Sequence, residues 1–475
     1  MQAQGVPDRL TSVREAGAVE AARLVARRAR MRKMRFDTIA VHGVYDMEEA
    51  LRNQGAIIEP VYAGPAQHFA SSDAMEAALG YLVPAWGYSR ITNPTVAYAE
   101  ETLALLESYG SGLEASAYLT SSGMSAVHMT TAPFLDVRYG ATMNVVAGAR
   151  CYGGTFMLFS ERYGAERGVE IRWVPDVGDI TAWEAAIDAR TRFVYVETPS
   201  NPSLAVADVE ALASVAHRNG VPLIVDATVA TPALLRPLAL GADVVVHSVS
   251  KCLAASGAVI AGALISRRDI VSRTGPEALR EDFATYVKLL PGRDHGPALA
   301  PASAASVLHD LRTLRSRVDQ MSRGAVRVAE FLAAHPGVDR VWYPGLPSHP
   351  GHDVATRQMR LVDAEPRDGA PERFGYLLGF EVRGGPERAR DVLDGLRLVF
   401  RATDLGRVKS VATIPAISTH QQQGGAGRAL GGVPDNLVRL SIGCEHPDDL
   451  IADLDWALAG AARRTRAQAA IRTSY

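Results

Sequence analysis

The chain has 475 residues, of which 47% are hydrophobic, which suffices for a large buried core and two or three lobes. Its 50 basic and 52 acidic residues nearly balance, so composition gives no reason to expect a nucleic acid or an anionic membrane as partner. No run of about 18 apolar residues predicts a membrane span. The three cysteines, Cys151, Cys252 and Cys444, lack metal-like spacing, so we expect no metal site and a reducing, cytoplasmic compartment.

The first 35 residues form a basic extension, in which eight arginines and one lysine face three acidic residues. Its Ala- and Arg-rich composition favours a helix. Three interpretations are open. The extension is a basic arm for an acidic partner such as DNA, a surface helix that packs on a neighbouring subunit, or a stretch upstream of a true start at Met31 or Met34. We favour the surface helix.

Between residues 95 and 264, short apolar segments alternate with segments of helical spacing. Continuous β-branched runs separated by helices predict a mostly parallel sheet covered on both faces. In such a sheet, ligands bind at the carboxyl ends of the strands. The expected strands are Thr142–Ala147, Val169–Val174, Arg192–Glu197, Pro222–Asp226, Asp243–His247 and Ala258–Leu264, and the expected helices include Thr181–Ala189 and Ala207–Asn219.

The segment Gly296–Ala305, rich in Pro and Ala, predicts a change of domain. After it, apolar spacing of three and four predicts one long helix, Ser306–His335, and then a smaller α+β lobe. The polar segment Val362–Arg373 has two prolines and predicts an exposed loop. The lobe's other expected elements are strands at Tyr376–Val382 and Leu437–Ile442 and a helix at Asp448–Ala461.

Lys251 directly follows a buried apolar strand, which is an uncommon place for an ammonium because its burial is costly. Taken alone, it is as readily a surface lysine whose amine reaches water. Ser248 and Ser250 beside it offer hydroxyls suited to phosphate oxygens. A desolvated lysine is also a better nucleophile toward an aldehyde.

Asp226 ends another very apolar strand, and a carboxylate there needs a cationic or donor partner. A pyridinium nitrogen is one such partner, since a facing aspartate keeps the ring protonated and able to accept electrons. The alternative is a helix cap after the strand.

Two further features complete the pattern. The Ser-Ser-Gly turn at Gly123 opens a helix, where free backbone amides favour a phosphate, although such turns are common. Tyr152 is able to stack on a planar ring, although an isolated aromatic is more often part of the core. Together, the glycine turn, tyrosine, aspartate and lysine, each at a strand end, match a phosphorylated pyridine aldehyde.

At this point the chain resembles the Cys/Met-metabolism family of pyridoxal phosphate enzymes, from about Phe36 to Ala459. That family includes cystathionine γ-synthase, cystathionine γ- and β-lyases, methionine γ-lyase and O-acetylhomoserine sulfhydrylase. The resemblance implies an α/β fold like that of aspartate aminotransferase (fold type I), with a mostly parallel seven-stranded sheet and a smaller C-terminal α+β domain. The matching segments include Tyr88-Ser-Arg-Ile-Thr-Asn-Pro-Thr, Ser122-Gly-Met, Tyr152-Gly-Gly-Thr, Glu197-Thr-Pro-Ser-Asn-Pro, Asp226-Ala-Thr-Val-Ala-Thr-Pro, Ser248-Val-Ser-Lys and Arg439-Leu-Ser-Ile-Gly.

The resemblance also implies an organisation and an assembly. The enzyme would be a homotetramer of two tight dimers that share active sites. Tyr88 and Arg90 would then reach the phosphate bound in the neighbouring subunit, and the planar fork of an arginine suits phosphate. The implied parts are a basic extension (1–35), an arm that contributes to the neighbouring site (36–95), a large cofactor-binding domain (96–300) and a C-terminal α+β domain (301–475).

The implied residue roles centre on Lys251, which would bond to the cofactor and then take the α proton of an amino-acid substrate. Tyr152 would stack on the ring and take part in proton transfer. Arg439 would clamp the substrate carboxylate near Asp404 and Leu405. The alternative for Arg439 alone is a surface ion pair, but its place on a strand with Leu440 and Ile442 suits a buried clamp better. The other implied cofactor contacts are Ser122, Gly123, Met124, Asn201, Asp226, Thr228, Ser248 and Ser250.

The sequence departs from the family mainly near the expected substrate. The usual Gly-His pair after Lys251 is missing, Asp404 replaces a serine, and Lys409 replaces a glutamate, which inverts the local charge. Gly154 replaces the cysteine typical of methionine γ-lyase, and Ala227 replaces the asparagine that usually follows the aspartate. We therefore expect γ-replacement on an activated homoserine, with γ-elimination and an aminotransferase reaction as the alternatives.

Overall fold

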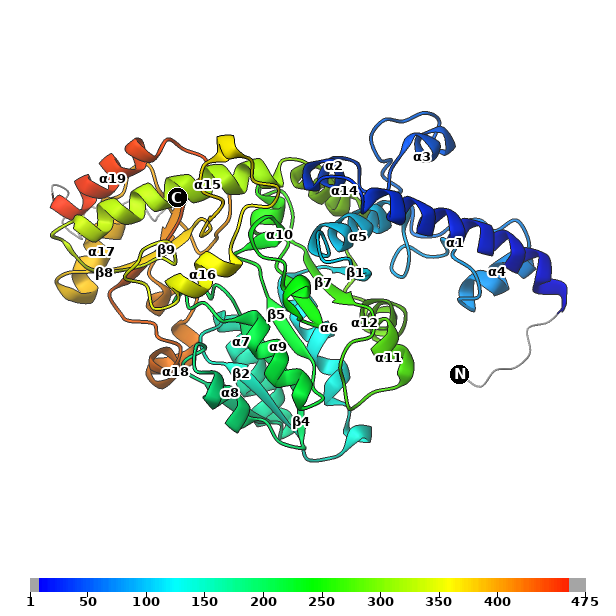
Figure 1. Cartoon of the computed structure of the whole chain (residues 1–475), viewed down its shortest axis with the longest axis horizontal. Helices are drawn as coiled ribbons and strands as arrows, with labels where there is room; N and C mark the ends of the chain where they lie inside the picture. Colours follow the sequence, from blue (N-terminus) through cyan, green and yellow to red (C-terminus); the bar gives the residue numbers. More distant parts are fainter. Residues whose placement is uncertain (1–7, 461–475) are drawn as a thin grey trace, which may run out of the picture.

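The computed structural model describes residues 8–460 and contains two β-sheets in separate lobes (Figure 1). The larger sheet has seven strands in the order β1-β7-β6-β5-β4-β2-β3. Its neighbouring strands are parallel from β3 to β6, and β7 runs antiparallel to both β6 and β1. The strands are β1 (Ala115–Thr120), β2 (Asn144–Gly148), β3 (Glu170–Val174), β4 (Thr191–Glu197), β5 (Leu223–Asp226), β6 (Val244–His247) and β7 (Gly262–Arg267).

The prediction of a mostly parallel seven-stranded sheet is confirmed, with two differences of detail. Strand β1 was not predicted, because its sequence alternates small and apolar residues without a continuous apolar run. Strand β7 begins at Gly262 rather than Ala258, because the residue before it, Ala261, is hydrogen-bonded to a loop residue instead of to a neighbouring strand. Both the amide and the carbonyl of Ala261 are hydrogen-bonded to the hydroxyl of Ser250, at 2.9 and 3.0 Å.

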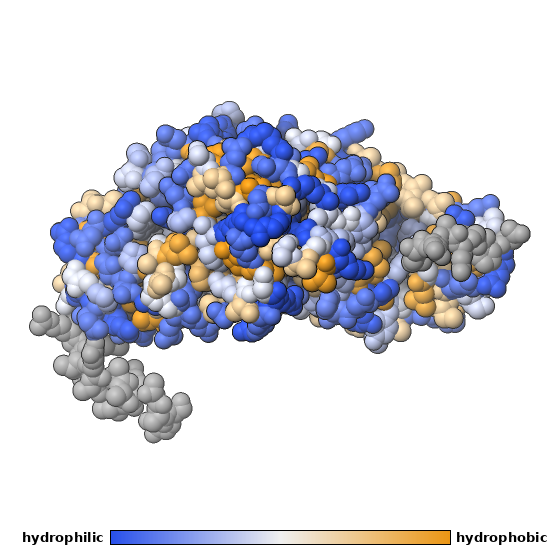
Figure 2. All heavy atoms as spheres, turned by 90° about the horizontal axis from the view of Figure 1, so that it is seen from below, coloured by the Kyte–Doolittle hydropathy of each residue, from blue (hydrophilic) through white to orange (hydrophobic). Residues whose placement is uncertain are grey.

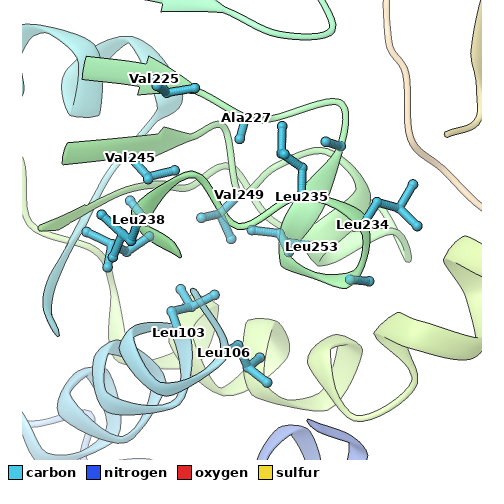
Figure 3. Close-up of a cluster of buried hydrophobic side chains, with 14 of the residues drawn as sticks. Leu103, Leu106, Val225, Ala227, Leu234, Leu235, Leu238, Val245, Val249 and Leu253 are labelled. Carbon is cyan, nitrogen blue, oxygen red and sulfur yellow. The ribbon is translucent and has the colours of Figure 1, made fainter. Parts of the chain in front are cut away.

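Helices cover both faces of this sheet, and alternate strand residues pack against each face. Val225 and Val245 point to the face covered by α5, whose Leu103 and Leu106 lie in the same buried cluster (Figure 3). Ile224 belongs to the cluster on the opposite face. The helices of this lobe are α2 (Phe36–His42), α3 (Met47–Arg52), α4 (Ser72–Leu79), α5 (Pro94–Glu107), α6 (Gly123–Thr131), α7 (Gly153–Met157), α8 (Ile180–Ala186), α9 (Val209–Arg218), α10 (Thr231–Leu234), α11 (Glu277–Glu281), α12 (Phe283–Val287) and α13 (Arg293–His295).

The smaller lobe has a five-stranded sheet in the order β10-β11-β12-β9-β8, with its own buried cluster. The predicted strands at Tyr376–Val382 and Leu437–Ile442 correspond to β9 and β12. The strands are β8 (Val338–Trp342), β9 (Leu377–Val382), β10 (Phe400–Arg401), β11 (Val411–Thr413) and β12 (Leu437–Ser441), and the helices are α14 (Pro301–Leu311), α15 (Leu314–Ala334), α16 (His352–Gln358), α17 (Gly385–Gly395), α18 (Gly424–Leu430) and α19 (Pro447–Ala459).

One expectation for this lobe is wrong, and another is confirmed only in part. The predicted single helix Ser306–His335 is two helices, because α14 packs on α5 of the large lobe whereas α15 packs on β8 and α19. Pro301 starts α14, since proline suits the first helical position. The loop Val362–Arg373 is exposed only in its middle, because both of its end residues are buried.

The basic extension forms helix α1 (Thr11–Met31), which packs on α4 of its own chain (Figure 1). Gly17 allows α1 to pack also on the segment that follows α4, because a Cβ there would lie 2.4 Å from a methyl group of Val83. Four of the five arginines of α1 are paired within the chain; for example, Arg27 is 2.6 Å from Glu49 and Arg28 bonds to Glu101 of α5. Such pairing disfavours the interpretation of the extension as a free DNA-binding arm.

The surface gives no sign of a membrane span. Among residues 8–460, no helix combines the length and the apolar character needed to cross a bilayer. Figure 2 shows hydrophilic residues over most of the face seen from below, with hydrophobic residues in scattered patches.

Candidate active site

A cavity of about 230 Å³ opens where the carboxyl ends of β4, β5 and β6 meet the start of α6. This is the edge at which the sequence predicted a ligand site. The predicted residues that line it are Ser122, Gly123, Met124, Tyr152, Asn201, Asp226, Thr228, Ser248, Ser250, Lys251, Leu405 and Arg439.

The start of α6 provides a cradle of backbone amides. Ser122 caps the helix by accepting a hydrogen bond from the amide of Ser125, and the first-turn amides of Gly123 and Met124 have no acceptor within the helix. Gly123 is required here, because a Cβ would lie 2.7 Å from Oγ of Ser248. These free donors at a helix N-terminus suit a phosphate group.

The two predicted serines differ in what they are able to offer a phosphate. In the described part of the chain the hydroxyl of Ser248 has no hydrogen-bond partner, and it faces the amides of α6 across this close contact. The hydroxyl of Ser250 already donates to the carbonyl of Ala261. Ser248 is therefore the available hydroxyl in this conformation.

Asp226 ends β5 inside the cavity, where it is 7% exposed. Its Oδ1 accepts hydrogen bonds from the amide and the hydroxyl of Thr228 at 3.0 and 2.6 Å, and Tyr195 donates to Oδ2 at 3.2 Å. Burial raises the pKa of Asp226. The helix-cap alternative is wrong, since the N-cap of α10 is Ala230.

Glu197, at the end of β4, is a cavity residue that sequence reasoning missed as part of the site. Its two carboxylate oxygens accept hydrogen bonds from the amides of Tyr152 and Asn201, each at 2.7 Å. Burial and the neighbouring charge of Asp226 raise its pKa. Glu197 thus fixes the backbone of two predicted site residues. The sequence signal that pointed to Asp226, a carboxylate at the end of a buried strand, applies equally to Glu197.

Lys251 projects into the cavity with its side chain 26% exposed, so it is not a surface lysine. Its amine donates to Oδ1 of Asp404 at 2.7 Å, and Oδ2 of Asp404 accepts from Nε of Arg407 at 2.5 Å. Burial alone would raise the pKa of Asp404, but the hydrogen bonds from these two cations lower it overall. Asp404 contacts Lys251 but does not itself line the cavity, whereas its neighbour Leu405 does.

Arg439 is 1% exposed and lies on β12 of the smaller lobe, facing the cavity. Its guanidinium donates to Oδ1 of Asn201 at 2.9 Å and to the carbonyls of Thr403 and Asp404 at 3.2 and 2.8 Å. Among residues 8–460, its buried Nε has no partner. The surface ion-pair alternative is thus wrong, and burial lowers its pKa to about 10.

Tyr152 lines the cavity with 37% of its surface exposed, and its ring packs against the ring of His420. The two rings meet edge to face, with their centroids 6.4 Å apart. His420 is 1% exposed, and burial lowers its pKa to about 4, so it is neutral at pH 7. Sequence reasoning missed it, because a single histidine in a loop carries no local signal.

Besides Asp404, three other residues that the sequence singled out, Tyr88, Arg90 and Lys409, lie outside the cavity. Tyr88 is 43% exposed, Arg90 lies over its ring at 5.5 Å, and the guanidinium of Arg90 also donates to the carbonyl of Arg293. Lys409 is exposed and lies over the ring of Phe400 at 5.3 Å. The inverted charge at Lys409 therefore does not line the cavity of this chain.

These features fit one kind of cofactor. Free amides and a free hydroxyl suit a phosphate, the Lys251 amine suits an aldehyde, and buried Asp226 suits a pyridinium nitrogen. With the seven-stranded sheet and the smaller lobe, the fold and the site define a pyridoxal phosphate enzyme of fold type I.

Comparison with known proteins identifies the family. A family model described as "Cys/Met metabolism PLP-dependent enzyme" matches residues 37–459. An L-methionine gamma-lyase of Pseudomonas putida is 36% identical over 427 residues, covering 90% of this chain and 98% of that protein. A cystathionine gamma-synthase of Mycobacterium bovis is 38% identical over 422 residues, covering 89% and 96%.

Solved structures agree with this result. A protein from Campylobacter jejuni described as O-acetylhomoserine (thiol)-lyase, which carries a pyridoxyl-lysine phosphate adduct, has a TM-score of 0.78 at 32% identity and covers 90% of this chain and 100% of its own. MetB from Corynebacterium glutamicum has a TM-score of 0.76 at 31% identity. The chain belongs to the Cys/Met-metabolism family of PLP-dependent enzymes, and its cofactor is pyridoxal phosphate.

Proposed function

We propose that this enzyme catalyses γ-replacement on an activated homoserine, an amino acid with a leaving group on its γ carbon. The observation that carries the proposal is that Lys251, Asp226 and Arg439, from distant parts of the chain, face one cavity. When bound there, pyridoxal phosphate draws electrons away from the α carbon of an amino acid.

The residues of the chain would hold the cofactor and the substrate at opposite ends of the cavity. The amides of Gly123 and Met124, with the hydroxyl of Ser248, would bind the phosphate, and Asp226 would hold the pyridine nitrogen. The unpartnered Nε of Arg439 would bind the substrate carboxylate. With a pKa of about 10, Arg439 stays a cation at neutral pH, as this role requires.

Lys251 would remove the α proton, because its amine projects into the cavity that would hold the substrate. Tyr152, which Glu197 fixes through its amide and His420 supports through its ring, would stack on the cofactor and assist proton transfer.

Gly154 supports replacement over a methionine γ-lyase reaction. A Cβ at this position would lie 2.6 Å from Cε1 of Tyr152 and 3.1 Å from Sδ of Met124. The cysteine typical of that lyase therefore does not fit beside Tyr152 in this orientation. Some relatives are named as lyases and others as a synthase or a sulfhydrylase, so γ-elimination is the alternative that the experiment below must distinguish.

We also propose a cytoplasmic homotetramer in which Tyr88 and Arg90 complete the cavity of a neighbouring subunit. Their exposure on the arm supports this assembly, as do other large apolar side chains exposed there. These are Ile57, Ile58, Val61, Leu79, Leu82 and Trp86. The three cysteines are free, which fits a reducing compartment.

The test offers O-acetyl-homoserine with and without a thiol, and cystathionine and methionine separately, to the purified enzyme. A replacement enzyme forms a new thioether only when the thiol is present. Release of 2-oxo acid and ammonia without a nucleophile would instead assign elimination. Conversion of the cofactor to its amine form without ammonia would assign an aminotransferase.

A further inference from the structure

Asp404 forms the central link of a chain of charges that begins at Lys251. Its Oδ1 accepts from the Lys251 amine at 2.7 Å, and its Oδ2 accepts from Arg407 at 2.5 Å. Asp404 stands where the family usually has a serine, and a serine would provide no negative charge. The Lys251 amine thus has a partner that competes with any other group it binds.

The surrounding backbone fixes Asp404 in this position. Gly406 has a φ of +72°, and a Cβ on it would lie 2.6 Å from the amide nitrogen of Cys252, so only glycine allows the two segments to come this close. Arg407 donates to the carbonyl of Ala254 at 2.8 Å. The carbonyl of Asp404 also accepts from Arg439. The carboxylate is therefore held against Lys251 by contacts on both sides.

This pair exists only while the amine of Lys251 is free. To bond to an aldehyde, the ammonium first gives a proton to solvent, the nitrogen joins the carbonyl carbon, and one water leaves. When an amino acid arrives, its amine takes over the same carbon and Lys251 is returned as a free amine, with no net water. Any group that stabilises free Lys251 opposes the first change and favours the second.

We propose that Asp404 is a positioning residue that holds the free amine of Lys251, weakening the bond of Lys251 to the cofactor and favouring its displacement by the amino-acid substrate. The inference rests on the proposed cofactor chemistry. Arg407 keeps the carboxylate oriented when Lys251 leaves it. The two side chains are 26% and 31% exposed, so the effect of the pair on either equilibrium is about 1.5- to 5-fold.

The experiment measures two affinities that must change in opposite directions. Cofactor-free Asp404→Asn protein is titrated with pyridoxal phosphate, followed by visible absorbance. The loaded protein is then titrated with glycine, which has no side chain to eliminate. We expect the substitution to tighten cofactor binding and to weaken glycine binding, each by about 1.5- to 5-fold.

Three further variants make the result specific. Asp404→Ser restores the residue usual in the family and should behave like Asp404→Asn, even if the latter folds poorly. Asp404→Glu keeps the charge and should stay near the wild type. Glu372→Gln, which removes a carboxylate of similar exposure paired with Arg360 outside the cavity, should change neither affinity.

Other outcomes overturn the inference. If both affinities weaken, Asp404 serves only to maintain structure. If both tighten, Asp404 acts by repelling the glycine carboxylate. If neither changes, the pair has no effect on Lys251. A wild-type protein that never acquires visible absorbance would overturn the proposed function itself, which separates that failure from the others.

Discussion

Replacing Gly123 with alanine tests whether the start of α6 is the phosphate site. The added Cβ would lie 2.7 Å from both Cβ and Oγ of Ser248 and 3.0 Å from its Cα. Carbon atoms in ordinary contact are about 3.5–4.0 Å apart, so the overlap is about 1 Å. Relief of that overlap must separate the α6 amides from Ser248, the two sets of donors that would share the phosphate.

Overpacking of this size costs about 1–3 kcal/mol. If the full cost falls on the cofactor-bound state, the dissociation constant for pyridoxal phosphate rises by about 5- to 150-fold. The assay is a titration of cofactor-free protein, followed by visible absorbance. The control is Gly425→Ala in α18, where a Cβ meets no atom within 4 Å and affinity should not change. An unchanged affinity in folded Gly123→Ala would falsify the assignment of the cradle.

Three further predictions concern the site and the stability of the chain. Lys251→Ala should lose its cofactor on gel filtration and lower kcat by about 10²- to 10⁴-fold, and retention of the cofactor through gel filtration would contradict its role. Burial lowers the pKa of His349 and His420 from 6.5 to about 4, so between these pH values the unfolded chain binds more protons than the folded one. Each histidine should therefore lower the unfolding free energy by about 2 kcal/mol between pH 7 and 5, against the opposite contribution of buried carboxyls such as Glu197, whose pKa is raised. His420→Gln should remove the share of His420, as measured by urea unfolding of the variant and the wild type at the two pH values. Arg27→Ala should destabilise the packing of α1 on the arm by about 3 kcal/mol, because it leaves Glu49 partly buried without its main cation, and an unchanged thermal midpoint would argue against this packing.

The sequence alone predicted most of the residues that line the cavity. Lys251 follows an apolar strand, Asp226 ends one, and Gly123 opens a helix after a Ser-Ser turn, so their local context was sufficient. Parallel strands bring their carboxyl ends to the same edge of a sheet, so residues distant in sequence could be predicted to meet there. The strand ends at Glu197, Asp226 and His247 agree with the expected ones.

The tertiary structure decided which polar groups meet around that edge. Asp404 contacts Lys251 across 153 residues of sequence, and His420 supports Tyr152 from a loop with no periodic pattern. Likewise, α1 turned out to be paired with acidic residues of its own chain. Hydrophobic periodicity is a local property that specifies helices and strands, whereas the partner of a charged side chain depends on which distant loops pack against it.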